Sequence, residues 1–266
     1  MPGATTNTPA LPQWLSAGQG GIPLVLLHGM GSTAPVWLPQ LQQFGASRLC
    51  VAWTMPAYAN SPPLAELTWP ALADSLDAMR AALGAERVHL LGHSIGGMVA
   101  QAYAHRFPQH VASLVLSATS AGFGRVSPAW IDDFLAQREK PLLDHGSFAD
   151  AAPTLLRGFM GPLSTPMAMK TAELAASTIS TDAYRAAMRL LTTFDRAADL
   201  PRLAMPTLLI AGSLDTQAPV KAMQRLRDQI AGSRMVTLDQ VGHMANLEAP
   251  EAFNQAVAAF LATLEV

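Results

Sequence analysis

The chain has 266 residues, a length that fits one large domain or one domain with a sizeable insertion. Hydrophobic residues make up 50% and charged residues only 14% of the sequence, which excludes a disordered chain and favours a well-buried core. The formal net charge is −2, and no long run of either sign occurs. We therefore expect neither nucleic acid nor a membrane surface among its partners.

The sequence shows no sign of export or membrane insertion. Residues Met1–Pro12 lack the positive and apolar regions of a signal peptide, and no apolar run approaches the roughly 20 residues that cross a bilayer. The single cysteine, Cys50, lies in an apolar run and is expected to be a buried small hydrophobe rather than a nucleophile. We expect a soluble, cytoplasmic protein.

Short apolar runs alternate with segments of helical periodicity along most of the chain. Uninterrupted apolar runs are typical of strands buried on both faces, and their alternation with helices predicts a parallel sheet covered on both sides. The predicted strands are Ile22–Leu27, Leu49–Trp53, Val88–Leu91, Val111–Leu116, Thr207–Ala211 and Met235–Leu238, and predicted helices include Trp69–Leu83, Gly96–Phe107, Val220–Ile230 and Pro250–Leu264.

The alternation stops between about Gly124 and Leu203, where Ala-, Leu- and Met-rich segments are punctuated by prolines. We interpret this stretch as an insertion of four helices between two strands. The predicted division is a core of residues 1–123 and 204–266 and an insertion of residues 124–203. Four methionines of the insertion fit either an adaptable apolar pocket or ordinary core packing: Met160, Met167, Met169 and Met188.

The strongest local signal is the segment Gly92–Gly97, with the sequence Gly-His-Ser-Ile-Gly-Gly, between a predicted strand and a predicted helix. This context is typical of a nucleophile elbow, whose tight turn requires small residues two positions before and after the serine. Gly92 and Gly96 meet that requirement. Ser94 is therefore the candidate nucleophile, and the alternative is a glycine-rich turn in which it only caps the helix.

A nucleophilic serine needs a base, and the sequence offers seven histidines. His243 follows the last predicted strand on a loop before the final helix, where a partly exposed imidazole can reach Ser94. Most of the others occupy a strand, the elbow, a helix end or the insertion, where structural or solvated histidines are usual. His243 is thus the predicted base.

The acid that orients this base must come from another loop at the same edge of the sheet. Asp215 follows a predicted strand within a polar loop, and doubly wound sheets place their sites at such strand ends. Its alternative role is to cap the next helix. Asp239 lies only four residues before His243, but a glycine turn intervenes, and we expect Asp239 at the surface.

The loop Leu27–Gly31 follows the first predicted strand and can supply one backbone N–H of an oxyanion hole. The residue after the nucleophile supplies the other. We assign the donors as the backbone amides of Met30 and Ile95. His28 and Gly29 form the supporting loop, in which His28 braces the backbone rather than transferring protons.

Four motifs, in this order and at this spacing, resemble the α/β-hydrolase superfamily over nearly the whole chain, from about Leu24 onward. The motifs are His28–Gly31, Gly92–Gly97, Gly212–Asp215 with Pro219, and Gly242-His243 with Asn246-Leu247-Glu248 and Pro250. The resemblance implies the α/β-hydrolase fold, a mostly parallel doubly wound sheet with a helical cap insertion that roofs the active site.

Within the superfamily, the chain most resembles bacterial 3-oxoadipate enol-lactonase-like esterases and lactonases. The segment Trp53–Ser61 carries this resemblance but departs from it at three positions. Thr54 stands where that group usually has Asp, and Ala57 and Ala59 stand where it usually has Gly. We expect a stiffer and less polar loop there.

These residues together predict a serine carboxylic ester hydrolase that cleaves a small, largely apolar ester or lactone through an acyl-enzyme, without a metal or an organic cofactor. One alternative is hydrolysis of a carbon–carbon bond in an aromatic ring-cleavage product, which uses the same triad and needs cations in the cleft. The other is a non-catalytic small-molecule receptor with the hydrolase fold. Candidate cations for the first alternative lie in the insertion: Arg125, Arg138, Arg157, Lys170, Arg185 and Arg189.

Overall fold

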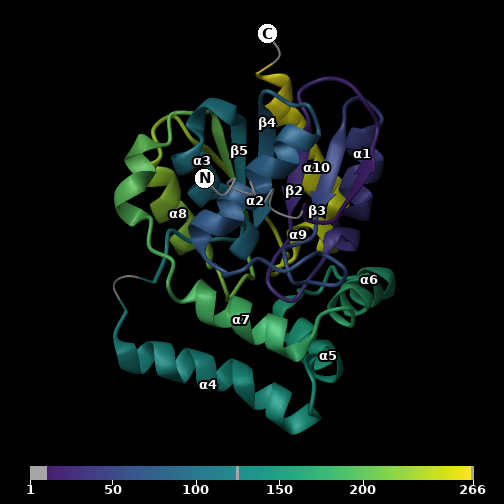
Figure 1. The fold of residues 1–266 in the computed structure, drawn as a ribbon, viewed down its shortest axis with the longest axis vertical. Coiled ribbons are helices and arrows are strands. Elements are labelled where there is room, and N and C mark those ends of the chain that lie inside the picture. Colours follow the sequence, from purple (N-terminus) through teal and green to yellow (C-terminus); the bar gives the residue numbers. More distant parts are fainter. Residues whose placement is uncertain (1–10, 124–125, 265–266) are drawn as a thin grey trace, which may run out of the picture.

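A seven-stranded sheet forms the centre of the computed structural model, which describes residues 11–123 and 126–264 (Figure 1). The strands lie in the order β1-β3-β2-β4-β5-β6-β7, and all neighbours are parallel except β1, which pairs antiparallel with β3. This arrangement confirms the predicted α/β fold with a mostly parallel sheet. The strand bounds are β1 (Trp14–Ala17), β2 (Leu24–Leu27), β3 (Cys50–Trp53), β4 (Val88–His93), β5 (Val111–Ser117), β6 (Thr207–Gly212) and β7 (Arg234–Leu238).

The predicted strands that are buried on both faces agree best with the structure. Every residue of β2, β3, β4 and β6 is buried, because both faces of a parallel sheet are covered by helices and no polar alternation is needed. Cys50 begins β3 and is fully buried, as expected. The expectation of two-sided burial is wrong for β7, whose first four residues are partly or fully exposed, because β7 is an edge strand. The opposite edge strand, β1, was not predicted.

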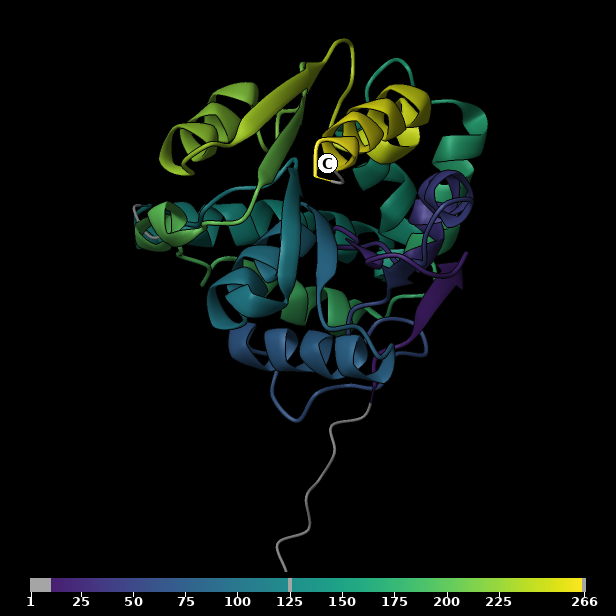
Figure 2. The same ribbon diagram turned by 90° about the horizontal axis from the view of Figure 1, so that it is seen from above.

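Helices cover both faces of the sheet (Figure 2). α1 and α10 pack together on one face, and α2 and α3 pack together on the other. α8 packs against β6 and β7, and α9 contacts α10. None of the helices in the described part of the chain is long and apolar enough to cross a membrane. The bounds are α1 (Leu38–Gly45), α2 (Trp69–Ala82), α3 (Ile95–Arg106), α8 (Val220–Gln229), α9 (Ala245–Glu248) and α10 (Pro250–Ala262).

Four further helices lie together at one end of the molecule and connect β5 to β6 in the chain (Figure 1). Each begins after a Ser or Thr whose side-chain oxygen accepts a backbone N–H of the first turn, which supplies one of the partners that a helix start lacks. The sequence predicted this number of helices, whereas the predicted boundary residue Gly124 lies outside the described residues. The bounds are α4 (Pro128–His145), α5 (Phe148–Phe159), α6 (Pro166–Ala176) and α7 (Thr181–Leu191).

The turn between β4 and α3 holds Ser94 in a strained backbone conformation. Its φ is 53° and its ψ is −120°, and such rarely populated conformations cost a residue about 1–3 kcal/mol. The strand and the helix approach so closely here that there is no room for further side chains. A Cβ on Gly92 would lie 2.4 Å from the Gly96 carbonyl oxygen, and a Cβ on Gly96 would lie 2.3 Å from the Leu27 carbonyl oxygen.

Substitution of Gly96 by Ala should therefore destabilise the fold strongly, by about 3 kcal/mol or more, because the clash is with backbone that cannot move aside. Gly158, an exposed residue of α5, is the matched control because a Cβ there meets nothing within 4 Å. Gly158→Ala should be neutral or stabilise by about 0.5–1 kcal/mol through helix propensity. Urea unfolding of both variants measures the difference. Equal midpoints would contradict the account of the turn.

Candidate functional site

A cavity lies between Ser94 and helices α4, α5 and α7. Its volume is about 110 Å³, well below the roughly 300–1,000 Å³ of sites for drug-sized ligands, so it suits a small molecule. Ser94, His93 and His243 contribute polar groups to one wall. Most of the remaining wall is apolar and consists of Met30, Met98, Phe123, Phe134, Phe148, Ala152, Leu155, Leu156, Phe159, Leu191 and Met244.

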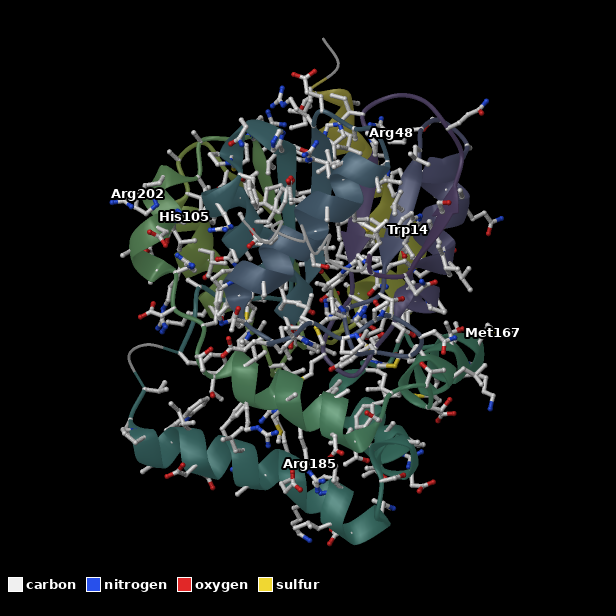
Figure 3. The ribbon with its side chains drawn as sticks, in the orientation of Figure 1. Trp14, Arg48, His105, Met167, Arg185 and Arg202 are labelled. Carbon is white, nitrogen blue, oxygen red and sulfur yellow. The ribbon has the colours of Figure 1, made fainter. Side chains whose placement is uncertain are left out.

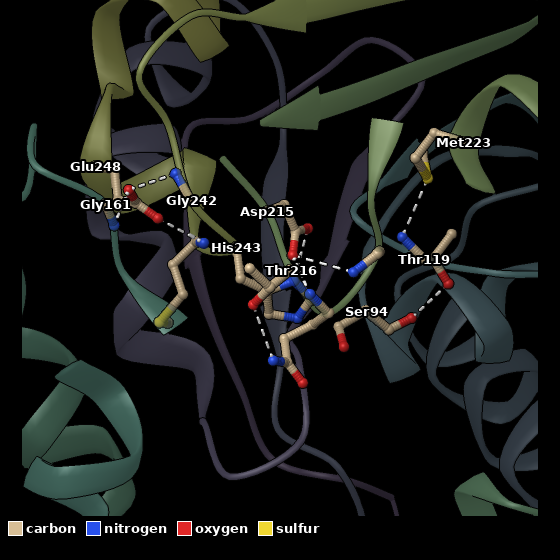
Figure 4. A network of polar contacts seen from close by, with 12 residues as sticks. Ser94, Thr119, Gly161, Asp215, Thr216, Met223, Gly242, His243 and Glu248 are labelled. Atoms are coloured by element: carbon tan, nitrogen blue, oxygen red, sulfur yellow. Dashed lines mark hydrogen bonds and ion pairs between the residues drawn. The ribbon is translucent and has the colours of Figure 1, made fainter. Parts of the chain in front are cut away.

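Asp215 and His243 meet across two neighbouring loops (Figure 4). Asp215 Oδ2 accepts a hydrogen bond from His243 Nδ1 at 2.9 Å, and the other carboxylate oxygen accepts the backbone N–H groups of Gln217 and Ala218 at 2.7 and 3.0 Å. Nδ1 therefore carries a proton, and Nε2 is the ring nitrogen left to exchange one. Ser94 lines the same cavity, and Figure 4 shows it on the far side of the imidazole from Asp215.

The surroundings of this pair favour an ionised acid. Burial raises the pKa of Asp215, but the hydrogen bond from His243 and those from Ala218 and Gln217 outweigh burial, so the pKa lies below its usual range. The Asp215 side chain is 0% exposed and that of His243 is 11% exposed, so the imidazole is more buried than the sequence suggested. Asp239 is exposed and accepts a hydrogen bond from the Ser213 hydroxyl.

His28 fixes the backbone of the loop after β2 through two hydrogen bonds. Its Nδ1 donates to the Gly29 carbonyl at 2.8 Å, and its Nε2 accepts the backbone N–H of Met55 at 3.0 Å. Burial lowers the pKa of His28 to about 4, although the bond to Gly29 opposes this, and the ring is neutral near pH 7. Met30, two residues after His28 in the same loop, lines the cavity. The backbone N–H groups of Met30 and Ile95 donate to no other described residue.

His93, which the sequence analysis set aside as the variable residue of the elbow, also lies at the site. The centre of its ring is 4.8 Å from that of His243, and a Cβ on Gly29 would lie 2.8 Å from a ring carbon of His93. Burial above all, with a further contribution from His243, lowers the pKa of His93 well below its usual range. The neutral ring thus fills the space between the loop after β2 and His243. No pattern in the sequence identifies this contact.

A second buried carboxylate fixes the backbone on both sides of His243 (Figure 4). Glu248 is 3% exposed and has no cationic partner among the described residues; its oxygens accept backbone N–H groups instead. The backbone N–H of His243 donates to the Phe159 carbonyl at 2.8 Å. These bonds join the His243 loop to the end of α5. The three donors to Glu248 are Gly161 at 2.7 Å, Gly242 at 2.8 Å and Met244 at 2.8 Å.

Of the two interpretations of the insertion's methionines, core packing is confirmed for Met160, Met169 and Met188, which lie in or against the hydrophobic core, and the pocket interpretation is wrong. None of the four lines the cavity, and Met167 is 74% exposed and points outward from α6 (Figure 3). The cavity's methionines come instead from the sheet side, at Met30, Met98 and Met244. A helical face exposed to solvent and one that faces a cavity are both compatible with Met, so spacing alone could not distinguish them.

Most of the basic residues suggested as cations of the cleft do not line the cavity. Arg125 lies outside the described residues, and of the other five, Arg138 alone lines the cavity. Arg185 pairs with Glu139 between α7 and α4. Within residues 11–123 and 126–264, no group of three or more His, Cys, Asp or Glu side chains is arranged to hold a metal ion.

Comparison with known proteins gives matches along most of the chain. The model of the alpha/beta hydrolase fold family matches residues 22–250. The dihydrolipoyllysine-residue acetyltransferase component of the acetoin cleaving system of Pseudomonas putida is 30% identical over 258 residues, which are 92% of this chain; the chain spans 64% of that protein's length.

Two further known proteins match this chain nearly end to end, one in sequence and one in fold. The pimeloyl-(acyl-carrier protein) methyl ester esterase of Pectobacterium carotovorum is 28% identical over 255 residues, which cover 93% of this chain and 97% of that protein. The crystal structure of the enol-lactonase from Burkholderia xenovorans LB400 shares the fold with a TM-score of 0.83 at 21% identity, covering 94% of this chain and 96% of that one.

The role of Glu248 in holding the His243 loop can be tested by Glu248→Gln. An amide places an N–H₂ donor against backbone donors, so at least one of the three hydrogen bonds is lost, and we expect a loss of about 1–3 kcal/mol in unfolding free energy. Glu251, exposed in the first turn of α10, is the control: Glu251→Gln should cost less than about 1 kcal/mol. Urea unfolding at pH 7 distinguishes the two, and a Glu248→Gln variant as stable as the parent would contradict the role.

Proposed function

The chain belongs to the α/β-hydrolase family, since the family model matches residues 22–250, and from this premise we propose that it is a serine hydrolase cleaving small, largely apolar carboxylic esters or lactones through an acyl-enzyme. The family match confirms the resemblance drawn from the four sequence motifs, and esterases and an enol-lactonase are among its relatives. The observation that carries the proposal is the hydrogen bond between Asp215 and His243 in a cavity that Ser94 also lines.

In the proposed mechanism, Ser94, His243 and Asp215 act as a catalytic triad. Ser94 Oγ attacks the carbonyl carbon while its proton passes to His243 Nε2, the nitrogen that faces away from Asp215. The same proton then passes to the leaving oxygen as its bond to the carbonyl carbon breaks; an ester releases a free alcohol, whereas the hydroxyl formed from a lactone stays joined to the acyl chain. Water then attacks the acyl-enzyme carbonyl and gives a proton to His243, which passes it to Ser94 Oγ as the acyl–oxygen bond breaks and the carboxylic acid leaves. Asp215 holds the ring in the tautomer that this requires and stabilises the imidazolium.

The negative charge that develops on the carbonyl oxygen needs hydrogen-bond donors in place before the reaction starts. We assign this role to the backbone N–H groups of Met30, in the loop after β2, and of Ile95, the residue directly after Ser94; neither N–H donates to a backbone carbonyl in the turns and loops of the described residues. Ile95 begins α3, so its N–H also belongs to the partly positive N-terminus of that helix. His28 and Gly29 position the Met30 loop.

We further propose that the insertion, residues 124–203, is a cap that roofs the site. α4, α5 and α7 supply most of the apolar cavity wall, which excludes water from the acyl group and favours apolar substrates. Cleavage of a carbon–carbon bond in a dicarboxylate would call for several cations at the cavity. Arg138 is alone there among the described cations, which favours ester cleavage.

Substitution of Ser94 by Ala should abolish hydrolysis of p-nitrophenyl butyrate, with kcat reduced by about 10⁴-fold or more, because the attacking oxygen is removed. Ser120, which lines the same cavity, is the matched control, and Ser120→Ala should stay within about tenfold of the parent. Circular dichroism confirms that both variants are folded. An active Ser94→Ala enzyme would refute the nucleophile, and a parent without any esterase activity would favour the receptor alternative.

Asp215→Asn should preserve folding but lower kcat by about 10⁴-fold, the loss seen for the same change in chymotrypsin-type proteases, since an amide disturbs the tautomer and removes the charge. Asp239→Asn removes an exposed carboxylate near His243 in sequence and should change kcat by less than about tenfold. Steady-state kinetics of both purified variants make the test. The reverse ranking would show that the wrong acid has been assigned.

A further inference from the structure

One wall of the cavity carries a positive charge that the proposed mechanism does not use. Arg138 extends from α4 into the cavity wall, and its guanidinium lies 3.5 Å from the centre of the Phe134 ring, one helical turn earlier. Its Nη2 donates to Gln217 Oε1 at 2.8 Å, and its Nη1 lies 3.5 Å from the Phe134 carbonyl oxygen. Both partners are neutral, so the charge has no carboxylate partner among the described residues.

Arg138 thus differs from arginines of the insertion that form ion pairs with a carboxylate. Arg185, for example, meets Glu139 in an ion pair. Arg138 is half-buried, and burial lowers its pKa, although a guanidinium remains charged at any physiological pH. Burial removes part of the hydration of this guanidinium, and an anion in the cavity would give it the opposite charge that its neutral neighbours do not supply.

The free donors of Arg138 suit a planar anion. A guanidinium offers five N–H donors in a fixed fork, and the two contacts to Gln217 and Phe134 leave three of them. Two parallel N–H donors match the two oxygens of a carboxylate. Tyr184 lines the same cavity near Arg138, and burial raises its pKa to about 12, so this neighbour adds no negative charge of its own.

The anion would lie within the same small cavity as Ser94. Gln217, the partner of Arg138, also donates its backbone N–H to Asp215 at 2.7 Å. Gln217 therefore links the guanidinium to the Asp215–His243 pair through hydrogen bonds. Ser94 and Arg138 both line this cavity of about 110 Å³, so one short molecule can contact both.

We propose that Arg138, oriented by Gln217, binds a free carboxylate of the substrate, so that the preferred substrates are short esters or lactones bearing a second, ionised carboxyl group. This inference rests on the proposed serine hydrolase function and narrows its substrate class. The apolar wall then accommodates the carbon chain between the two carboxyl groups, while Arg138 fixes its far end.

The test compares monomethyl glutarate with methyl 5-methylhexanoate, in which an isopropyl group replaces the carboxylate at nearly the same shape. The parent enzyme should prefer the charged ester in kcat/KM by about 10- to 100-fold, the range expected for charge-assisted hydrogen bonds. Arg138→Met should lose this preference, so that the charged-to-neutral ratio of kcat/KM falls to about 1, and Arg138→Lys should retain part of it. Arg185→Met, which removes a partly exposed cap cation that does not line the cavity, should leave the preference unchanged.

A binding measurement separates this proposal from the catalytic one. In the Ser94→Ala background, calorimetry should detect glutarate binding that Arg138→Met abolishes. If the parent hydrolyses neutral esters but the charged-to-neutral ratio is the same with and without Arg138, the carboxylate subsite is refuted and the hydrolase stands. If no ester is cleaved but glutarate binding still requires Arg138, the hydrolase fails and the subsite stands.

Discussion

The close approach of α3 to the sheet at Ser94 is the constraint from which the rest of the site follows. A Cβ on Gly96 would clash with the carbonyl oxygens of Leu27 and His28, so the helix start can pack this closely against the end of β2 and the loop after it only with glycine at this position. Met30, in that loop, and Ser94, at that helix start, therefore line the same cavity. The same turn places Ser94 in an unfavourable backbone conformation, and the strain persists because its neighbours leave no alternative.

Two buried carboxylates then complete the site by different means. Asp215 binds the ring of His243, whereas Glu248 binds backbone on both sides of it and reaches Gly161 beyond α5. Because the His243 N–H also donates to Phe159, the end of α5 is attached to the His243 loop. If the insertion is the cap that we propose, its opening should involve α4, the helix that carries Arg138, more than the end of α5.

The sequence predicted the parallel strands and the residues at their carboxyl ends because both signals are local: continuous apolar runs and motifs directly after them. It could not predict β1, a four-residue edge strand, or the contacts that join distant segments, such as Glu248 with Gly161. Ala57 and Ala59 adopt φ values of 71° and 46°, in the left-handed region that favours Gly, so the chain forms this turn without glycine at either position. Which cap side chains face the cavity depends on how four helices pack, which no periodicity specifies.

The most direct test of the account is covalent labelling by a fluorophosphonate, followed by mass spectrometry of the digested protein. Such a reagent reacts with a serine only where a base activates the hydroxyl and donors stabilise the phosphoryl oxygen. The account predicts stoichiometric modification of the peptide containing Ser94, and none after Ser94→Ala. Modification of another serine, or no modification of the folded protein, would contradict the claim that Ser94, His243 and Asp215 form a working triad.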